Sequence, residues 1–218
     1  MASIDDPATS ARPESPSTKS EPAPKIYRLS VRQYLRGIDA GALVDTRLEL
    51  LSGILVRQMG KSTRDNYPLI ALPAALRAIV PDSWLVLNNV SLRLGRRSRS
   101  EPDLIIVSGP VIRYKSQDPH ARETPLVIEL AGASYEMNRG FKWRRYAAAK
   151  IPVYWIINLN TNQVEVFREP TGAGSKAAYG QTEIYGIDAL VPVIIAGVEV
   201  GRIAVRDVLP ELPGTDQR

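Results

Sequence analysis

The sequence has no cysteine and only one histidine among its 218 residues. Without cysteine, the chain has no disulfide scaffold, thiolate zinc site or cysteine nucleophile. The single histidine, His120, excludes every site that needs two imidazoles, including the H-E-x-x-H helix of metalloproteases. His120 lies in the polar stretch 115–124, and we interpret it as a solvated loop residue.

Two further catalytic and binding motifs are absent. The sequence contains no G-x-S-x-G elbow, and a Ser–His–Asp triad would depend wholly on His120. Gly60-Lys61-Ser62 ends like a phosphate-binding P-loop, but that motif requires a glycine five residues before Gly60. Leu55 occupies that position, so nucleotide binding by this route is excluded.

Long hydrophobic runs are also absent. Apolar stretches such as 190–198 are much shorter than the roughly 20 residues that span a bilayer. The first ten residues, MASIDDPATS, are polar, whereas a signal peptide requires an apolar stretch. These features predict a soluble cytoplasmic protein with no membrane partner.

Charge and composition divide the chain into a tail and a domain. Residues 1–24 carry four acidic and two basic side chains and contain five prolines but no aromatic residue. Such a segment cannot bury enough apolar surface to fold, so we predict a disordered tail over 1–24. The rest is long enough for a single domain, 25–209, followed by a C-terminal tail, 210–218. That remainder has a net charge of +7 within a chain total of +5, which suits a polyanionic partner.

Hydrophobic periodicity predicts a mixed α+β fold, in the α/β class, with a central mixed sheet flanked by helices and a β-rich C-terminal extension. The apolar runs 102–107 and 125–130 are typical of central strands that are buried on both faces. The capping pattern Ser30-x-x-Gln33 predicts a helix start, and Pro73 should bend or break a helix over 66–80. The remaining expected elements are strands within 48–56 around a Ser52-Gly53 turn, strands 84–88, 90–94, 153–158 and 164–168, a helix over 138–150, β structure to about 200, and a short helix over 205–209.

Three carboxylates interrupt apolar strands: Glu49, Asp103 and Glu129. Burying a carboxylate costs several kcal/mol unless it is paired or binds a metal. If the fold brings the three together, a divalent cation would relieve their repulsion, and hard oxygen ligands favour Mg²⁺ or Mn²⁺. For Glu49, an outward-facing strand position is nearly as good an interpretation.

The expected helix 138–150 carries the opposite charge, with five basic residues and no acidic one. Helical spacing places Asn138, Lys142, Arg145 or Tyr146, and Ala149 along one face. We take Phe141, Tyr146 and Ala149 as core-facing candidates. Lys142 could lean toward the carboxylate strand, orient a water molecule and offset charge on a phosphate.

Further arginines are candidates for contact with a nucleic-acid backbone. Arg96, Arg97 and Arg99 belong to a stretch, 93–99, that contains no acidic residue, and Arg139 and Arg145 lie in the basic helix. An ordinary solvated surface is the alternative interpretation.

Together these residues resemble a known family. Pro102-Asp103, the run Leu126-Val-Ile-Glu129, then Lys142 and Tyr146, and finally the run 151–158 are similar to the Uma-type putative restriction endonucleases, a branch of the PD-(D/E)xK nuclease superfamily. The resemblance covers about residues 28–209 and is most specific over 125–158.

The resemblance implies a restriction-endonuclease-like core and Mg²⁺-dependent cleavage of DNA. Asp103 and Glu129 would hold the metal, Glu49 would assist, and Lys142 would act from the helix, because Ala131 occupies the usual lysine position. The chain differs from the family at Asn138, where an aspartate is common. It also has Asp65-Asn66 where a histidine often begins the second helix.

Two other hypotheses remain open at this point. One is a catalytically weak or inactive nuclease fold that binds nucleic acid, and the other is an interaction domain with a solvated basic face. The sequence leaves the oligomeric state, including a homodimer, undecided, and it leaves open the target and the choice between DNA and RNA.

Overall fold

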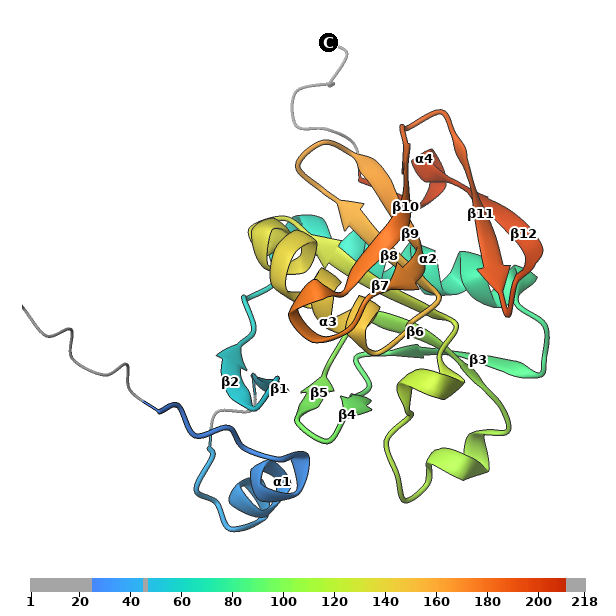
Figure 1. Ribbon diagram of the computed structural model, residues 1–218. Helices are drawn as coiled ribbons and strands as arrows, with labels where there is room; N and C mark the ends of the chain where they lie inside the picture. The colour runs from blue at the N-terminus through green and yellow to red at the C-terminus, as the bar shows by residue number, and fades with distance from the viewer. Residues whose placement is uncertain (1–24, 45–46, 211–218) are drawn as a thin grey trace, which may run out of the picture.

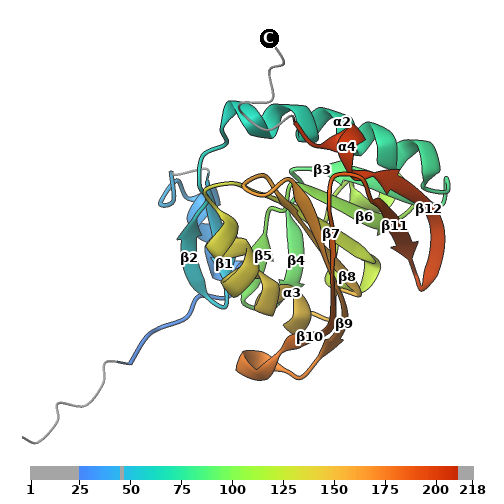
Figure 2. The ribbon, with the colours of Figure 1, turned by 90° about the horizontal axis from the view of Figure 1, so that it is seen from above.

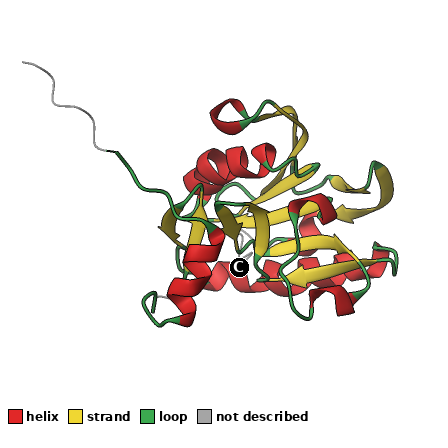
Figure 3. Ribbon diagram, turned by 60° about the horizontal axis from the view of Figure 1, so that its bottom comes forward, coloured by secondary structure: helices red, strands yellow, loops and turns green. Residues whose placement is uncertain are grey.

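The computed structural model describes residues 25–44 and 47–210, so the predicted tail 1–24 and all but Pro210 of the predicted C-terminal tail lie outside the described residues. In these residues the strands form three sheets, with helices on both sides of the largest (Figures 1 and 3). The helices are α1 (Val31–Asp39), α2 (Thr63–Ile79), a π-helix (Met137–Lys142), α3 (Trp143–Ala148) and α4 (Val205–Val208), with short 3₁₀ helices at Val111–Tyr114, Ala121–Glu123 and Gly174–Lys176. The strands are β1 (Leu48–Leu51), β2 (Ile54–Arg57), β3 (Trp84–Asn88), β4 (Leu92–Gly95), β5 (Ser98–Ser100), β6 (Leu104–Ser108), β7 (Leu126–Ala131), β8 (Val153–Asn158), β9 (Gln163–Thr171), β10 (Ala178–Tyr185), β11 (Leu190–Ile195) and β12 (Val198–Ala204).

The largest sheet has six strands in the order β10-β9-β8-β7-β6-β3. It is mixed, because β7 and β8 run parallel, whereas the other pairs are antiparallel. The helical crossover that parallel strands require is supplied here by the π-helix and α3. The predicted mixed α+β class and central mixed sheet are therefore confirmed.

The two faces of this sheet are covered by different elements (Figure 2). Side chains such as Leu104 and Ile128 pack on one face with α2, α4 and the β11–β12 hairpin. Ile105 and Val127 belong to the other core, on the α3 side, with Tyr146. Because strand side chains alternate between faces, the residues Asp103 and Glu129 share the α3 side.

Helix α2 differs from the prediction at both its start and its middle. It begins at Thr63 and continues to Ile79, with Pro68 and Pro73 inside it. At its start, Asp65 accepts hydrogen bonds from the backbone N–H and the hydroxyl of Ser62, at 2.5 and 2.6 Å. Each interior proline costs about 3 kcal/mol or more, and burial of the helix against β3, β12 and α4 offsets that cost. Pro73 was expected to bend or break the helix, and of these two outcomes the break is wrong, because α2 continues to Ile79.

The predicted helix 138–150 is two elements. Its first part is a π-helix, Met137–Lys142, and α3 follows directly. Asn138, Lys142 and Tyr146 are buried along one face, as the spacing predicts. Phe141, an expected core position, is only half-buried, whereas its neighbour Lys142 is buried.

The second sheet has the order β2-β1-β5-β4 and lies beside the π-helix and α3 (Figures 1 and 2). Its β1–β2 hairpin turns at Ser52 and Gly53, where φ is 54° and 78°, and two positive φ values in a two-residue loop are typical of a type I′ turn. The predicted turn is confirmed. The predicted strand 90–94 is displaced to Leu92–Gly95, and the three-residue β5 was not predicted.

The C-terminal part is β-rich, as expected. Strand β10 extends the six-stranded sheet, while β11 and β12 form a separate antiparallel pair. The short helix α4 matches the predicted 205–209 element. No helix among the described residues is long and apolar enough to cross a bilayer.

Candidate active site

Asp103 and Glu129 are brought together by the register of β6 and β7. Leu104 lies opposite Ile128 in this antiparallel pair, and extending the register by one residue places Asp103 opposite Glu129. Asp103 Oδ2 accepts a hydrogen bond from the backbone N–H of Leu130 at 2.7 Å. Both carboxylates are only 3% exposed, so the strand ends hold two acidic groups in a dry environment.

Two side chains from the crossover helix bind the same oxygen of Glu129. Lys142 Nζ donates to Glu129 Oε1 at 2.9 Å, and the Tyr146 hydroxyl donates to it at 2.6 Å. Lys142 and Tyr146 are four residues apart and therefore share a helix face. Since both bonds use Oε1, they fix the carboxylate while the second oxygen, Oε2, takes no part in either bond.

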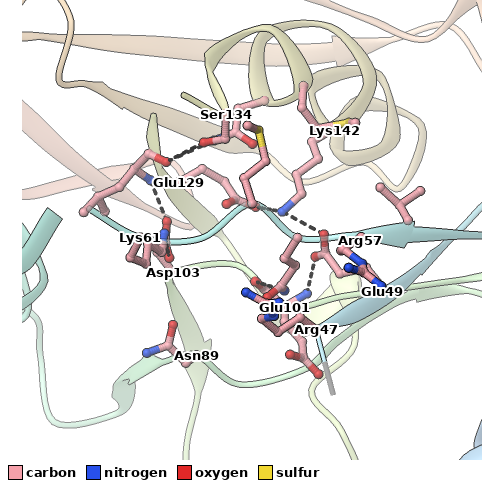
Figure 4. Close-up of a pocket in the computed structure, with 16 residues that line it drawn as sticks. Arg47, Glu49, Arg57, Lys61, Asn89, Glu101, Asp103, Glu129, Ser134 and Lys142 are labelled. Carbon is pink, nitrogen blue, oxygen red and sulfur yellow. Dashed lines mark hydrogen bonds and ion pairs between the residues drawn. The ribbon is translucent and has the colours of Figure 1, made fainter. Parts of the chain in front are cut away.

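Glu49, on β1 of the four-stranded sheet, contacts the same lysine (Figure 4). Lys142 Nζ lies 3.0 Å from Glu49 Oε2, and Glu49 Oε1 accepts a hydrogen bond from the backbone N–H of Glu101 at 2.6 Å. Glu49 is 1% exposed, so its outward-facing alternative is wrong. Lys142 thus bridges carboxylates from two sheets.

Burial and neighbouring charges together shift the pKa values of Glu129 and Lys142. Desolvation raises the pKa of Glu129 to about 7, although the Lys142 charge opposes the rise, and the nearby charges of Asp103 and Glu49 add to it. For Lys142, burial alone would lower the pKa, but the charges of Glu129 and Glu49 outweigh it and the pKa is raised. The two carboxylates therefore favour the charged ammonium form of Lys142.

Lys61 is a member of the site that the sequence did not reveal. It forms an ion pair with Asp103 Oδ1, while its side chain is 42% exposed. It lies in the segment between β2 and α2. The sequence did contain a motif around this lysine, Gly60-Lys61-Ser62, but we excluded it as a nucleotide-binding site because it lacks the remainder of a P-loop. Its lysine nevertheless reaches a carboxylate that the sequence singled out.

These groups line a pocket of about 310 Å³ between the two sheets and the π-helix (Figure 4). Four basic side chains, including Arg57 and Lys61, and four acidic ones, including Glu101, line it. This volume is at the small end of ligand pockets. The pocket is therefore lined by equal numbers of acidic and basic side chains, whereas the sequence suggested a cluster of carboxylates.

The residues that fit a divalent cation are Asp103 and Glu129. Over residues 25–44 and 47–210, no group of three or more His, Cys, Asp and Glu side chains is arranged to hold a metal ion. Glu49 is engaged by Lys142 instead. Two carboxylates still suit Mg²⁺, which usually keeps several waters and takes one or two protein carboxylates. The donor set therefore fits Mg²⁺ or Mn²⁺ with two protein ligands.

Asn138 bonds to the segment that follows Glu129. Its amide nitrogen donates to the carbonyl of Leu130 at 3.2 Å and to the hydroxyl of Ser134 at 3.3 Å. Asn138 thus holds the end of β7, next to Glu129, while the two glutamates orient Lys142.

The candidate DNA-binding arginines lie in different environments. Arg99 donates to Asp118 at 2.7 and 3.2 Å, and Arg139 lies 3.2 Å from Glu165, so acidic partners offset both charges. Arg145 donates to the Ser52 hydroxyl. Arg96 and Arg97 are exposed in the turn between β4 and β5.

His120 lies between the elements of the 115–124 stretch, as predicted, but it is half-buried there and not fully solvated as we expected. It precedes the 3₁₀ helix Ala121–Glu123, and its backbone N–H donates to Glu123 Oε2 at 3.1 Å. This contact gives the residue a structural part in ending the loop.

Comparison with solved structures places the fold among nuclease-like proteins. A protein from Anabaena variabilis, described as a putative nuclease belonging to DUF820, matches with a TM-score of 0.61 and 14% sequence identity. The match covers 83% of this chain and 97% of the other. At this identity the likeness shows a shared nuclease-like fold.

The family follows from the sequence match. The model of the Uma2 family, described as "Putative restriction endonuclease", matches residues 34–199, and the chain belongs to this family. The resemblance drawn from Asp103, Glu129 and Lys142 is therefore confirmed at the level of the family. A search of curated proteins found no significant match.

Proposed function

We propose that the protein is a Mg²⁺- or Mn²⁺-dependent endonuclease that hydrolyses DNA phosphodiester bonds. The observation that carries the proposal is the meeting of three groups in one pocket: the Asp103 and Glu129 carboxylates on adjacent strands, and the Lys142 ammonium 2.9 Å from Glu129. Membership of a family described as restriction endonucleases supports a nucleic acid as the substrate.

Each residue has a distinct part in this reaction. Asp103 and Glu129 would hold the cation, which supplies positive charge that polarises the phosphodiester and makes a nearby water more acidic. Lys142 stays protonated, so it can donate to the attacking water or to a phosphate oxygen and offset charge there. Tyr146 acts as a positioning residue, because its hydroxyl fixes Glu129.

The test is incubation of the purified protein with supercoiled plasmid in Mg²⁺, Mn²⁺ or EDTA. We expect nicked and linear products with either metal and intact plasmid in EDTA. Intact plasmid in all three conditions would contradict the proposal, as would equal cutting in EDTA.

A second candidate function is a nucleic-acid-binding module without catalysis. The observation that favours it is the Lys61–Asp103 ion pair, because an ammonium there competes with a cation for one of the two metal-binding carboxylates. A protein of this kind would retard DNA on a gel without cutting it. Its thermal stability would also be unchanged by Mg²⁺, since a ligand raises stability only if it binds the folded state.

A further inference from the structure

Five arginines lie on the three segments that contact the turn between β1 and β2. They come from three separate segments: the chain before α1, the turn between β4 and β5, and helix α3. Four of them are exposed, and Arg145 is half-buried. The five are Arg28, Arg96, Arg97, Arg144 and Arg145.

Backbone contacts at Gly53 bring two of these segments together. The Leu29 N–H donates to the Gly53 carbonyl at 3.0 Å, and the Gly53 N–H donates to the Arg97 carbonyl at 2.6 Å. A side chain at Gly53 could not be accommodated, because a Cβ would lie 2.6 Å from Arg28 Cβ and 2.9 Å from the Leu29 carbonyl oxygen. The positive φ of 78° also favours glycine. This turn therefore holds Arg28 and Arg97 on either side of itself.

Ser52 connects the turn to α3. Arg28 Nη1 donates to the Ser52 carbonyl at 2.8 Å, and Arg145 donates to the Ser52 hydroxyl. Both acceptors are neutral, so these bonds orient the guanidinium groups without cancelling their charge. Arg145 also lies over the Phe141 ring, with its guanidinium carbon 5.0 Å from the ring centre.

The neighbours of Arg145 have the same charge. Burial lowers the pKa of Arg145, and the charges of Arg144 and Arg28 lower it further. Arg99 and Arg139 differ, because Asp118 and Glu165 face them. Like charges held together by backbone and hydroxyl contacts repel one another, so an anion at this place would relieve the repulsion.

The position of the cluster relative to the pocket indicates which anion fits. Lys142 pairs with Glu49, and Arg145 pairs with Ser52. In each segment the two residues are three positions apart. Two adjacent turns of a helix are separated by about 5 Å, which is comparable to the rise of one or two nucleotides along a DNA strand. A strand with one phosphate at Lys142 would therefore place neighbouring phosphates beside the arginines.

We propose that Arg28, Arg97, Arg144 and Arg145, gathered around the Ser52-Gly53 turn, form a surface that binds the phosphate backbone of DNA next to the Glu129–Lys142 site. The choice of DNA as the polyanion rests on the proposed function. The surface contacts phosphates as point charges and is independent of base sequence.

The test measures binding of the full chain to a fluorescent 30-base-pair duplex, by anisotropy in EDTA, over 50–200 mM KCl. One variant combines Arg28→Gln, Arg97→Gln and Arg144→Gln. The matched control combines Arg122→Gln, Arg202→Gln and Arg206→Gln, which removes the same charge from exposed arginines on other elements. Circular dichroism establishes that both variants fold.

We expect the first variant to lose up to about 0.9 units of log–log salt slope for each phosphate contact removed, or roughly 8-fold in affinity per contact at 0.1 M salt. The control should retain most of the parent slope. Equal losses in both variants would overturn the proposal, and so would a parent that does not bind the duplex. Plasmid cutting is measured separately: binding without cutting sustains this surface and contradicts the nuclease, whereas cutting with an unchanged salt slope does the reverse.

Discussion

The Lys142 ammonium lies 2.9 Å from the Glu129 carboxylate, although the two residues are 13 positions apart. Ala131, two residues after Glu129, is fully buried in the core beneath α3. The π-helix, which connects β7 to β8 together with α3, therefore passes over the end of β7 and places Lys142 beside Glu129. This approach determines that Lys142 binds Oε1 of Glu129.

Replacing either carboxylate of the proposed metal site should abolish cleavage. Asp103→Asn and Glu129→Gln each remove a charge that would hold the cation, and we expect plasmid nicking in Mg²⁺ to fall at least about 100-fold. Glu165→Gln is a matched control, since Glu165 is a buried strand carboxylate that pairs with Arg139. Full activity in either site variant would contradict the assignment.

The pH dependence of stability should reveal the raised pKa of Glu129. Its pKa is about 7 in the fold against 4.5 in the unfolded chain, so the folded state binds this proton more tightly. The resulting contribution to stability is complete below pH 4.5 and is lost as pH rises through 7. In EDTA, urea unfolding should therefore show a steeper fall in the free energy of unfolding between pH 5 and 7 for the parent than for Glu129→Gln, by at most about 1.4 kcal/mol per pH unit. Identical pH profiles would show that Glu129 titrates normally.

Tyr146→Phe should weaken metal use more than it harms the fold. The change removes the 2.6 Å bond to Glu129 but retains the aromatic contact with Tyr154, whose ring centre is 4.9 Å away. We expect a loss of about 1–3 kcal/mol in stability and a 10- to 100-fold rise in the Mg²⁺ concentration that gives half-maximal nicking. A merely structural tyrosine would lower stability and leave the metal titration unchanged.

Lys61 should compete with the cation. If its ammonium occupies Asp103, Lys61→Ala frees that oxygen, and the Mg²⁺ concentration for half-maximal nicking should fall several-fold. Lys61→Arg, which keeps the charge, is the control and should resemble the parent. A higher Mg²⁺ requirement in Lys61→Ala would mean that the lysine assists the metal site instead.

Asn138→Asp should destabilise the end of β7. An aspartate cannot donate to the Leu130 carbonyl as the Asn138 amide does, and its charge would be buried beside Glu129. We expect a loss of about 1–3 kcal/mol and slower cleavage at equal Mg²⁺, with Asn138→Ala losing less because it adds no charge. Faster cleavage in Asn138→Asp would instead favour a direct influence on Lys142.

The central sheet and its acidic residues could be predicted because buried strands leave a strong pattern. Continuous apolar runs identify β6 and β7, and a carboxylate within such a run is costly enough to need a partner. Helical spacing placed Lys142 on one face with either Arg145 or Tyr146, and the structure shows that Tyr146 is the buried one. These features depend on short stretches of sequence whose burial is nearly complete.

Other features depend on contacts that no local pattern encodes. Strand β5 is three polar residues, and it forms because β1 and β4 lie on either side of it. Helix α2 passes through Pro73 because its packing outweighs local preference. Lys61 reaches Asp103 from an exposed segment, and Asp118 neutralises Arg99 across 19 residues. In each case the decisive partner is distant in the chain.

Lys142 bridges two sheets that are each hydrogen-bonded separately, with Glu49 on one and Glu129 on the other. The proposed catalytic lysine therefore lies where the two sheets meet, and its distances to Glu49 and Glu129 depend on how closely the sheets pack. A small separation of the two sheets would leave the hydrogen bonds within each sheet intact but break the contacts of Lys142 with Glu49 and Glu129. Cleavage activity would therefore be lost well before secondary structure. Loss of cleavage in mild denaturant would thus report local separation of the two sheets. Unfolding of the whole domain follows at a higher denaturant concentration.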